Sequence, residues 1–405
     1  MEDAARLIRV ASFRELLQGA SSTTAPNSIR KDMVHLCAGF RLGNRPGTSP
    51  RKSADAAQPV VSDRRVERQR ELCFDFVRGM MILWVFVIHV ALNGGICRFG
   101  EAFSCRSVFC WLSFYMATFY FFSGYLLRHI RSPRETFLKG IRSLILPCAA
   151  MTLFGLVVYV VASFTFMGSI DWRFPFKGSM KTFCLRTTPP LWFFISLFFV
   201  KLIHSTLYRF LHGTAGTTAM SILLVLIAWK TCNRPQLFGY GNVCIGFFFY
   251  NLGFLSKRFP TIADNGLFIL SALVVYVTIP FLTPLGLWFS QNVRTETCRG
   301  VGYMLDIAFS GAACLLLCSF ARRIPLNGPI AAAICHVGRD SLFYFGIHRP
   351  ILNFAFDPLF NRIFASSGTS IYFVTAIIFL LLAGSLCVRI WKRIGISSER
   401  RMMPS

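Results

Sequence analysis

The sequence predicts an all-α fold, a polytopic integral membrane bundle of about ten transmembrane helices. Hydrophobic residues make up 54% of the 405 positions and charged residues only 15%, and the mean hydropathy is +0.54. That composition is too apolar for an ordinary water-soluble domain. Because the bilayer core is roughly 30 Å thick and offers no water to the backbone, each run of about 20 apolar residues is expected to form one helix.

Ten apolar segments follow residue 72, and the fifth and sixth are the shortest. No convincing internal repeat relates them, so one indication of a transporter fold is absent. The expected spans lie at about 73–93, 108–127, 143–162, 190–210, 216–230, 242–255, 265–284, 303–320, 335–354 and 370–390.

A basic extension, residues 1–72, precedes the first span. It is rich in Arg, Ser, Ala and Pro and has no apolar stretch long enough for a signal peptide, which predicts a largely disordered cytoplasmic segment. A true start of translation near Met33 explains part of it equally well. Residues 391–405 are expected to form a basic cytoplasmic tail, which leaves 73–390 as the transmembrane domain.

Clusters of basic residues predict the orientation in the membrane. The extension carries 13 Lys and Arg, the turn after the second span five, and the chain after residue 388 five, and all lie on one side if there are ten spans. That side is expected to be cytoplasmic, with both termini inside an inner (plasma) membrane. Four basic residues in the opposite loop, 163–189, run against this assignment.

The formal net charge of +25 would suggest a nucleic-acid partner in a soluble protein. Here the basic residues lie in the extension or border apolar segments, where they set topology and attract anionic lipid. No nucleic acid is therefore expected. The 14 Cys form neither a CxxC pair nor a Cys/His cluster at metal spacing, so no metal site is expected.

The first span, CFDFVRGMMILWVFVIHVAL, carries Asp75, Arg78 and His89. Arg78 and His89 are eleven residues apart, about 16 Å along a helix and about 20° around it, so they share a face with Asp75 close by. Ionisable groups at membrane depth usually face the bundle interior and mark function. An interfacial Asp75–Arg78 pair and a structural, hydrogen-bonded His89 both stay open as alternatives.

The ninth span repeats this pattern in HVGRDSLFYFGIHRPIL. His348 and Arg349 lie toward its outer end, and Ser341, seven residues before His348, shares its face. Pro350 is expected to interrupt the hydrogen-bond ladder there. Two spans thus each bring a histidine to the outer half of the membrane.

Four stretches together resemble the acyltransferase-3 family of bacterial membrane proteins, and particularly its branch similar to fucose 4-O-acetylases. They are FDFVRGMMILWVFVIHV, with a basic residue, ten others and a histidine, then MATFYFFSGYLLR, PLWFFISLFF and VGRDSLFYFGIHRPIL. Together they extend from residue 73 to about residue 352, and the family's ten spans agree with the ten apolar segments.

The resemblance implies transfer of an acyl group, commonly acetyl, from an acyl-CoA donor to a hydroxyl of a cell-surface polysaccharide or glycolipid. It makes His89 the candidate catalytic base or acyl carrier, with Arg78 its motif partner and His348 a second catalytic candidate. An imidazole with a pKa near neutrality suits removal of a hydroxyl proton. The expected partners are acyl-CoA, the glycan acceptor and membrane lipid, with no bound cofactor.

The family's basic pair, usually Arg-x-x-Arg, corresponds to Lys139 and Arg142, where Lys loses the bidentate fork. Arg131 and Arg134 have the same spacing and are an equal match. Such a cluster is a candidate entrance for the anionic coenzyme, although it also fits a topology signal.

The oxyanion of acyl transfer needs hydrogen-bond donors, and Arg349, Ser341 and Trp192 are the candidates. Trp192 fits an interfacial aromatic belt equally well. A secondary transporter or channel is the competing class, because intramembrane charges also mark ion paths. A family member that has kept only a binding role is the other alternative.

Overall fold

The computed structural model divides into two units, Met1–Val60 and Val61–Ser405. The predictions for residues 1–58 and for the tail from residue 394 lie outside the described part of the chain. The second unit contains the helical bundle. The structure describes residues 59–96, 107–173, 191–231, 240–263, 265–282, 301–324, 326, 328–364 and 368–393.

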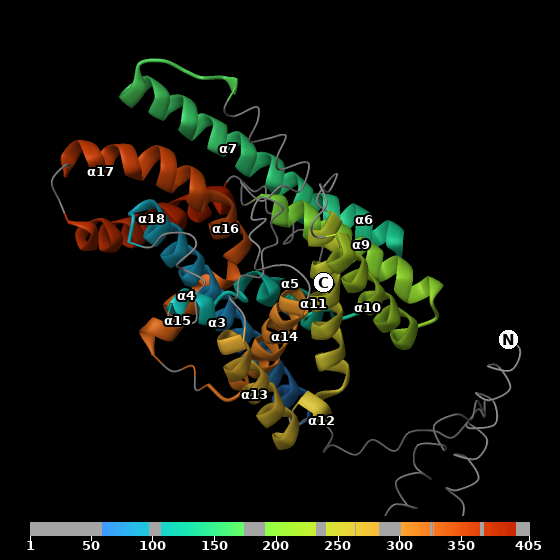
Figure 1. The fold of residues 1–405 in the computed structure, drawn as a ribbon. Coiled ribbons are helices and arrows are strands. Elements are labelled where there is room, and N and C mark those ends of the chain that lie inside the picture. The colour runs from blue at the N-terminus through green and yellow to red at the C-terminus, as the bar shows by residue number, and fades with distance from the viewer. Residues whose placement is uncertain are drawn as a thin grey trace, which may run out of the picture. The chain divides into compact units, whose positions relative to one another are not determined.

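Every regular element in the described ranges is a helix, which confirms the predicted all-α class. Figure 1 shows the order of the α-helices along the chain by colour. In the helix names below, η denotes a π-helix. The helices are α3 (Pro59–Asn93), α4 (Val108–Trp111), α5 (Tyr115–Tyr125), α6 (Pro133–Gly140), η3 (Ile141–Ile145), α7 (Leu146–Ala162), η4 (Ser163–Met167), α9 (Trp192–Phe210), α10 (Thr214–Thr231), α11 (Tyr240–Arg258), α12 (Pro260–Ala263), α13 (Gly266–Leu282), α14 (Val301–Ala321), α15 (Pro329–Arg339), α16 (Ser341–Pro350), η7 (Ile351–Phe356), α17 (Asp357–Ile363) and α18 (Thr369–Arg393).

Six helices in the described chain are long and apolar enough to cross a membrane, so the predicted number of ten is not confirmed. They are Leu72–Asn93, Pro133–Phe166, Trp192–Phe210, Thr214–Thr231, Val301–Ala321 and Thr369–Arg393.

The other four predicted segments are helical but shorter, broken or more polar. The second is split into α4 and α5, and the ninth is broken at Asp340, where φ is −100° and ψ is 20°. The seventh is the 17-residue α13. The sixth, α11, carries buried Asn242 and Asn251.

Helix α3 starts earlier than the sequence predicted. It begins at Pro59, so the last part of the predicted extension is helical and Arg78 lies well inside the helix. A Cβ on Gly79 would collide with the carbonyl oxygen of Ile334, and one on Gly338 with the carbonyl oxygen of Asp75. Helices α3 and α15 therefore approach each other backbone to backbone, as small residues allow inside membranes.

Aromatic side chains fill the space between α3 and α5. Phe74 is fully buried, with its ring centroid 5.2 Å from that of Phe122 and 4.7 Å from that of Tyr125. Glycines bring α5 equally close to α11, because a Cβ on Gly124 would meet the carbonyl oxygen of Tyr250. These contacts fix the direction of α3, the helix that carries His89.

The outward side of α18 is a continuous apolar stripe. Exposed Val374, Ile378 and Leu382 alternate with inward-facing Ala376 and Leu380, which are buried. An ordinary soluble protein rarely exposes such a continuous apolar stripe to water, whereas the acyl chains of lipids can cover it. The stripe therefore marks a face for lipid, in keeping with an integral membrane protein.

Candidate active site

His89 of α3 and His348 of α16 lie face to face. Their ring centroids are 5.0 Å apart and their planes meet at 30°. Phe86, nearly one turn before His89, packs against His348 with 5.6 Å between centroids. The structure thus brings together the two histidines that the sequence placed on separate spans, and we call them the histidine pair.

Each ring of the pair keeps one nitrogen without a partner. Nδ1 of His348 lies 2.7 Å from the carbonyl oxygen of Phe345, which assigns the proton to Nδ1 as the donor. Its Nε2 then carries a lone pair. That atom and Nδ1 of His89 are buried and have no hydrogen-bond partner among the described residues. A buried imidazole with a free lone pair is what a general base requires.

A hydrogen-bonded polar network lies about one turn beyond the pair. Asn93 donates to Oδ1 of Asn353 at 2.9 Å and to Oδ2 of Asp357 at 3.1 Å, and its Oδ1 accepts from Arg349 at 3.5 Å. Tyr372 donates to Oδ1 of Asp357 at 2.6 Å. Burial raises the pKa of Asp357, while bonds from Tyr372 and Asn93 and the charge of Arg349 oppose that rise. We call these five residues the polar network.

A cavity of about 580 Å³ lies toward the other end of α3 and α16. Its wall includes Arg78, eleven residues before His89, and Ser341, seven before His348. Asp340 is the one acidic residue among the described residues of this wall. The Lys and Arg residues of the wall are Arg78, Arg128, Arg131, Lys139, Lys201, Arg339 and Lys392. We call it the basic cavity, and its excess of positive charge suits a polyanionic ligand.

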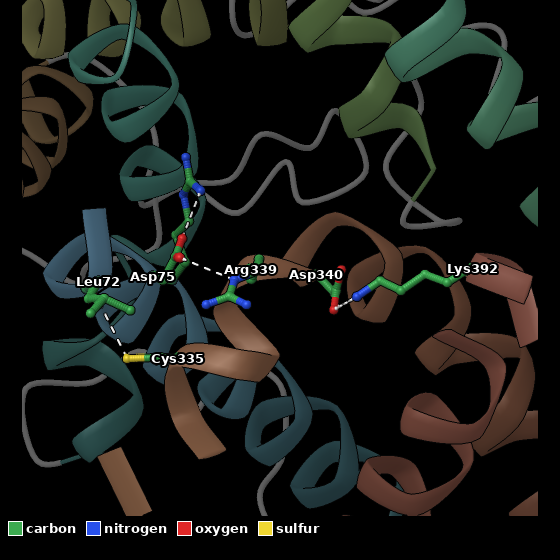
Figure 2. A network of polar contacts seen from close by, with 7 residues as sticks. Leu72, Asp75, Cys335, Arg339, Asp340 and Lys392 are labelled. Atoms are coloured by element: carbon green, nitrogen blue, oxygen red, sulfur yellow. Dashed lines mark hydrogen bonds and ion pairs between the residues drawn. The ribbon is translucent and has the colours of Figure 1, made fainter. Parts of the chain in front are cut away.

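Ion pairs join the helices at the basic cavity (Figure 2). The Asp75 carboxylate is 3.5 Å from the Arg78 guanidinium and 3.8 Å from that of Arg339, which ties α3 to α15. Lys392 is 2.7 Å from Asp340, which ties α18 to the junction between α15 and α16. These contacts hold Arg78 and Lys392 at the cavity wall.

A capping box positions the basic turn before α6. Ser132 Oγ accepts from the backbone N–H of Glu135 at 3.2 Å, and the Glu135 carboxylate accepts from the backbone N–H of Ser132 at 3.3 Å. Arg131 precedes this cap and Lys139 lies in the last turn of α6, and both reach the basic cavity.

The remaining two candidates for acyl-CoA binding point elsewhere. Arg134 and Arg142 are exposed and are not part of the cavity wall. The structure therefore places one member of each of the two basic pairs, Arg131 and Lys139, in the cavity wall. Spacing along the chain does not by itself decide which member of a pair reaches the cavity.

Three aromatic rings separate the basic cavity from the histidine pair. Phe119 and Phe193 belong to the cavity wall. Phe345 packs against both, with 6.1 Å to Phe119 and 5.5 Å to Phe193, and against His348 at 5.7 Å, all between ring centroids. One layer of side chains thus stands between the two sites.

The three candidate oxyanion donors occupy different places. Arg349 follows His348 directly and bonds to the polar network. Ser341 is buried in the wall of the basic cavity. Trp192 is buried at the start of α9, where it packs edge to face on Phe193 at 6.2 Å. Of the three, Arg349 is adjacent in the chain to a member of the pair.

Sequence reasoning missed most of the polar network and part of the cavity wall. Asn93 is four residues after His89 and therefore on its face, a signal that helical periodicity contains. Asp357 and Tyr372 come from later helices, and nothing in the sequence joins them to His89. His204 is buried in the cavity wall, and its Nε2 has no partner among the described residues.

A helical membrane bundle with a histidine pair beside a basic cavity has the parts expected of a membrane acyltransferase. The family model described as an acyltransferase domain matches residues 71–390, so the chain belongs to the acyltransferase-3 family. Comparison with curated proteins and with solved structures gave no match. Family membership favours an acyltransferase over a transporter or channel, while the branch similar to fucose 4-O-acetylases stays a prediction.

Proposed function

We propose that this protein transfers an acyl group, preferably acetyl, from acyl-CoA to a hydroxyl of a cell-surface polysaccharide or glycolipid. The observation that carries the proposal is the placement of the histidine pair between a basic cavity and a polar network. Both α3 and α16 run from the cavity, past the pair, toward the network. Donor and acceptor thus have separate approaches to one base.

The basic cavity is the proposed donor site. Coenzyme A carries several phosphate charges, which Arg78, Arg131 and Lys139 neutralise. The apolar part of the wall, including Phe119 and Phe193, suits the pantetheine arm and the acyl group. Since coenzyme A is cytoplasmic, this proposal puts the basic cavity on the cytoplasmic side and the polar network on the outer side.

The histidine pair supplies the base. A ring nitrogen removes the proton of the acceptor hydroxyl as its oxygen attacks the thioester carbonyl carbon. The oxyanion is stabilised by a donor, for which Arg349 is placed best, and collapses with breakage of the C–S bond. The imidazolium returns its proton to the thiolate of coenzyme A. In the alternative order a histidine first takes the acyl group itself and then passes it to the hydroxyl.

Labelled acetyl transfer from acetyl-CoA to glycan in membranes tests the proposal. His89→Ala is expected to lower the rate by about 10²–10⁴-fold, as for loss of a general base. His336→Ala is the matched control, because His336 is exposed on α15, and it is expected to behave as wild type. Equal rates in all three proteins, or solute uptake that responds to His89→Ala without any acyl transfer, would contradict the proposal.

A further inference from the structure

The polar network differs in charge from the basic cavity. It holds one positive side chain, Arg349, and one negative side chain, Asp357, together with two carboxamides and a phenol. The cavity wall instead carries seven Lys and Arg. A balanced set of donors and acceptors does not concentrate polyanions, but it matches hydroxyl groups, each of which donates and accepts.

The network lies where an acceptor must arrive. Asn93 is one helical turn, about 6 Å, beyond His89 on the same face of α3. Arg349 is adjacent to His348, whose Nε2 is buried and has no hydrogen-bond partner among the described residues. Asn93 is exposed, so a ligand reaches the network without passing the aromatic layer around Phe345.

Helices α3, α16–α17 and α18 hold the network. Tyr372 of α18 is buried and fixes the Asp357 carboxylate through Oδ1, while Oδ2 accepts from Asn93. Phe354, between the Asn353 and Asp357 positions, adds an aromatic ring that packs edge to face on Tyr159 at 5.1 Å. Fixed polar groups beside an aromatic surface are usual in sites for small ligands.

We infer that the polar network is the acceptor site and that it binds an uncharged sugar unit, whose hydroxyl it presents to the histidine pair. Asn93 and Asp357 bind neighbouring hydroxyls of the sugar. Arg349 lies between these two residues and the thioester carbonyl carbon that the acceptor hydroxyl attacks. This inference rests on the proposed function, since it names the acceptor side of the same reaction.

Kinetic measurements in which the acceptor and the donor are varied one at a time test this inference. Asn93→Ala and Asp357→Asn are expected to raise KM for a neutral dextran oligosaccharide about tenfold, because each loses hydrogen bonds worth roughly that factor. KM for acetyl-CoA should stay within about twofold of wild type. Thr375→Ala is the control, because it loses only hydrogen bonds to backbone carbonyls of its own helix, at Ile371 and Tyr372, and leaves the Tyr372 hydroxyl in place; it should change neither constant.

A binding measurement keeps the outcome independent of turnover. The dextran oligosaccharide is expected to raise the thermal midpoint of the wild-type protein and not that of Asp357→Asn. A larger shift from charged oligogalacturonide overturns the inference, as does an unchanged acceptor KM in both variants while transfer still depends on His89. If the dextran oligosaccharide still raises the thermal midpoint but no His89-dependent acyl transfer occurs, the proposed function is contradicted while the sugar site is not.

Discussion

The two unpartnered ring nitrogens of the histidine pair need a physical reason. A buried polar atom without a hydrogen bond lowers the stability of the folded state by about 1–3 kcal/mol. Among the described residues, the histidine pair has two such atoms, Nδ1 of His89 and Nε2 of His348. His348 Nδ1 is satisfied by the Phe345 carbonyl, so its ring orientation is fixed and only Nε2 is left open. A site that keeps both ring nitrogens open to a substrate accounts for both atoms.

His348→Phe tests whether that nitrogen acts chemically. Phenylalanine keeps a flat ring against Phe86 and Phe345 and removes both nitrogens, so packing is expected to change little. Acyl transfer should fall by about 10²–10⁴-fold if Nε2 moves a proton. Wild-type transfer by a folded His348→Phe protein would assign His348 a packing role and leave His89 as the base.

The Lys and Arg residues of the basic cavity lead to a separate prediction about binding of the acyl-CoA donor. Lys139→Ala is expected to raise KM for acetyl-CoA several-fold with little change in kcat, because a phosphate loses one charge partner. The effect should shrink as salt is added, since salt screens the same interaction. Arg142→Ala removes an exposed charge three residues away that does not line the cavity. An equal effect of both substitutions would point to general surface charge instead of a site.

At the scale of the element, the ninth predicted span is the most changed. It consists of α15, α16 and the π-helical η7, with a break at Asp340 and a widened turn after Pro350. Proline has no backbone N–H, so Pro350 cannot donate to the hydrogen-bond ladder of the helix, which explains why the α-helix gives way to a π-helix there. The break lets Arg339 and Ser341 both face the basic cavity while His348 reaches His89.

The contact between α3 and α15 can be tested through a glycine. Gly338→Ala places a Cβ against the Asp75 carbonyl, where backbone must move, and is expected to cost about 1–3 kcal/mol or more. Gly311→Ala is the matched control, because its Cβ would meet only a Leu252 methyl at 3.7 Å. Thermal midpoints in detergent measure both. A Gly338→Ala midpoint no lower than that of Gly311→Ala would show that α3 and α15 do not pack backbone to backbone.

At the scale of the whole molecule, an aromatic layer lies between the basic cavity and the histidine pair. Phe345 touches the cavity wall on one side and His348 on the other. In the proposed reaction the pantetheine arm and its acyl group have to pass this layer to reach the histidine pair, while the phosphates of coenzyme A stay at the basic end. Under the proposed function, this arrangement joins a cytoplasmic donor to an acceptor on the outer side.

Sidedness provides the corresponding prediction. If the basic cavity receives coenzyme A, then Lys392 in its wall lies on the cytoplasmic side and so does the end of α18. A reporter that fluoresces only in the cytoplasm, fused after Arg393, is expected to be fluorescent, and a phosphatase that folds only outside is expected to be inactive. The reverse result would put the cavity outside and exclude coenzyme A as its ligand.

The resemblance of four stretches in the sequence indicated the family, while its composition and periodicity determined the all-α membrane class and the helical nature of the ten apolar segments. They also placed Arg78 and His89 on one face, because helix geometry is local and repeats along the chain. The tertiary structure alone paired His89 with His348, chose Arg131 and Lys139 for the basic cavity, and assembled the polar network. These depend on which helices meet, and that is set by close glycine contacts and aromatic packing between segments far apart in the chain.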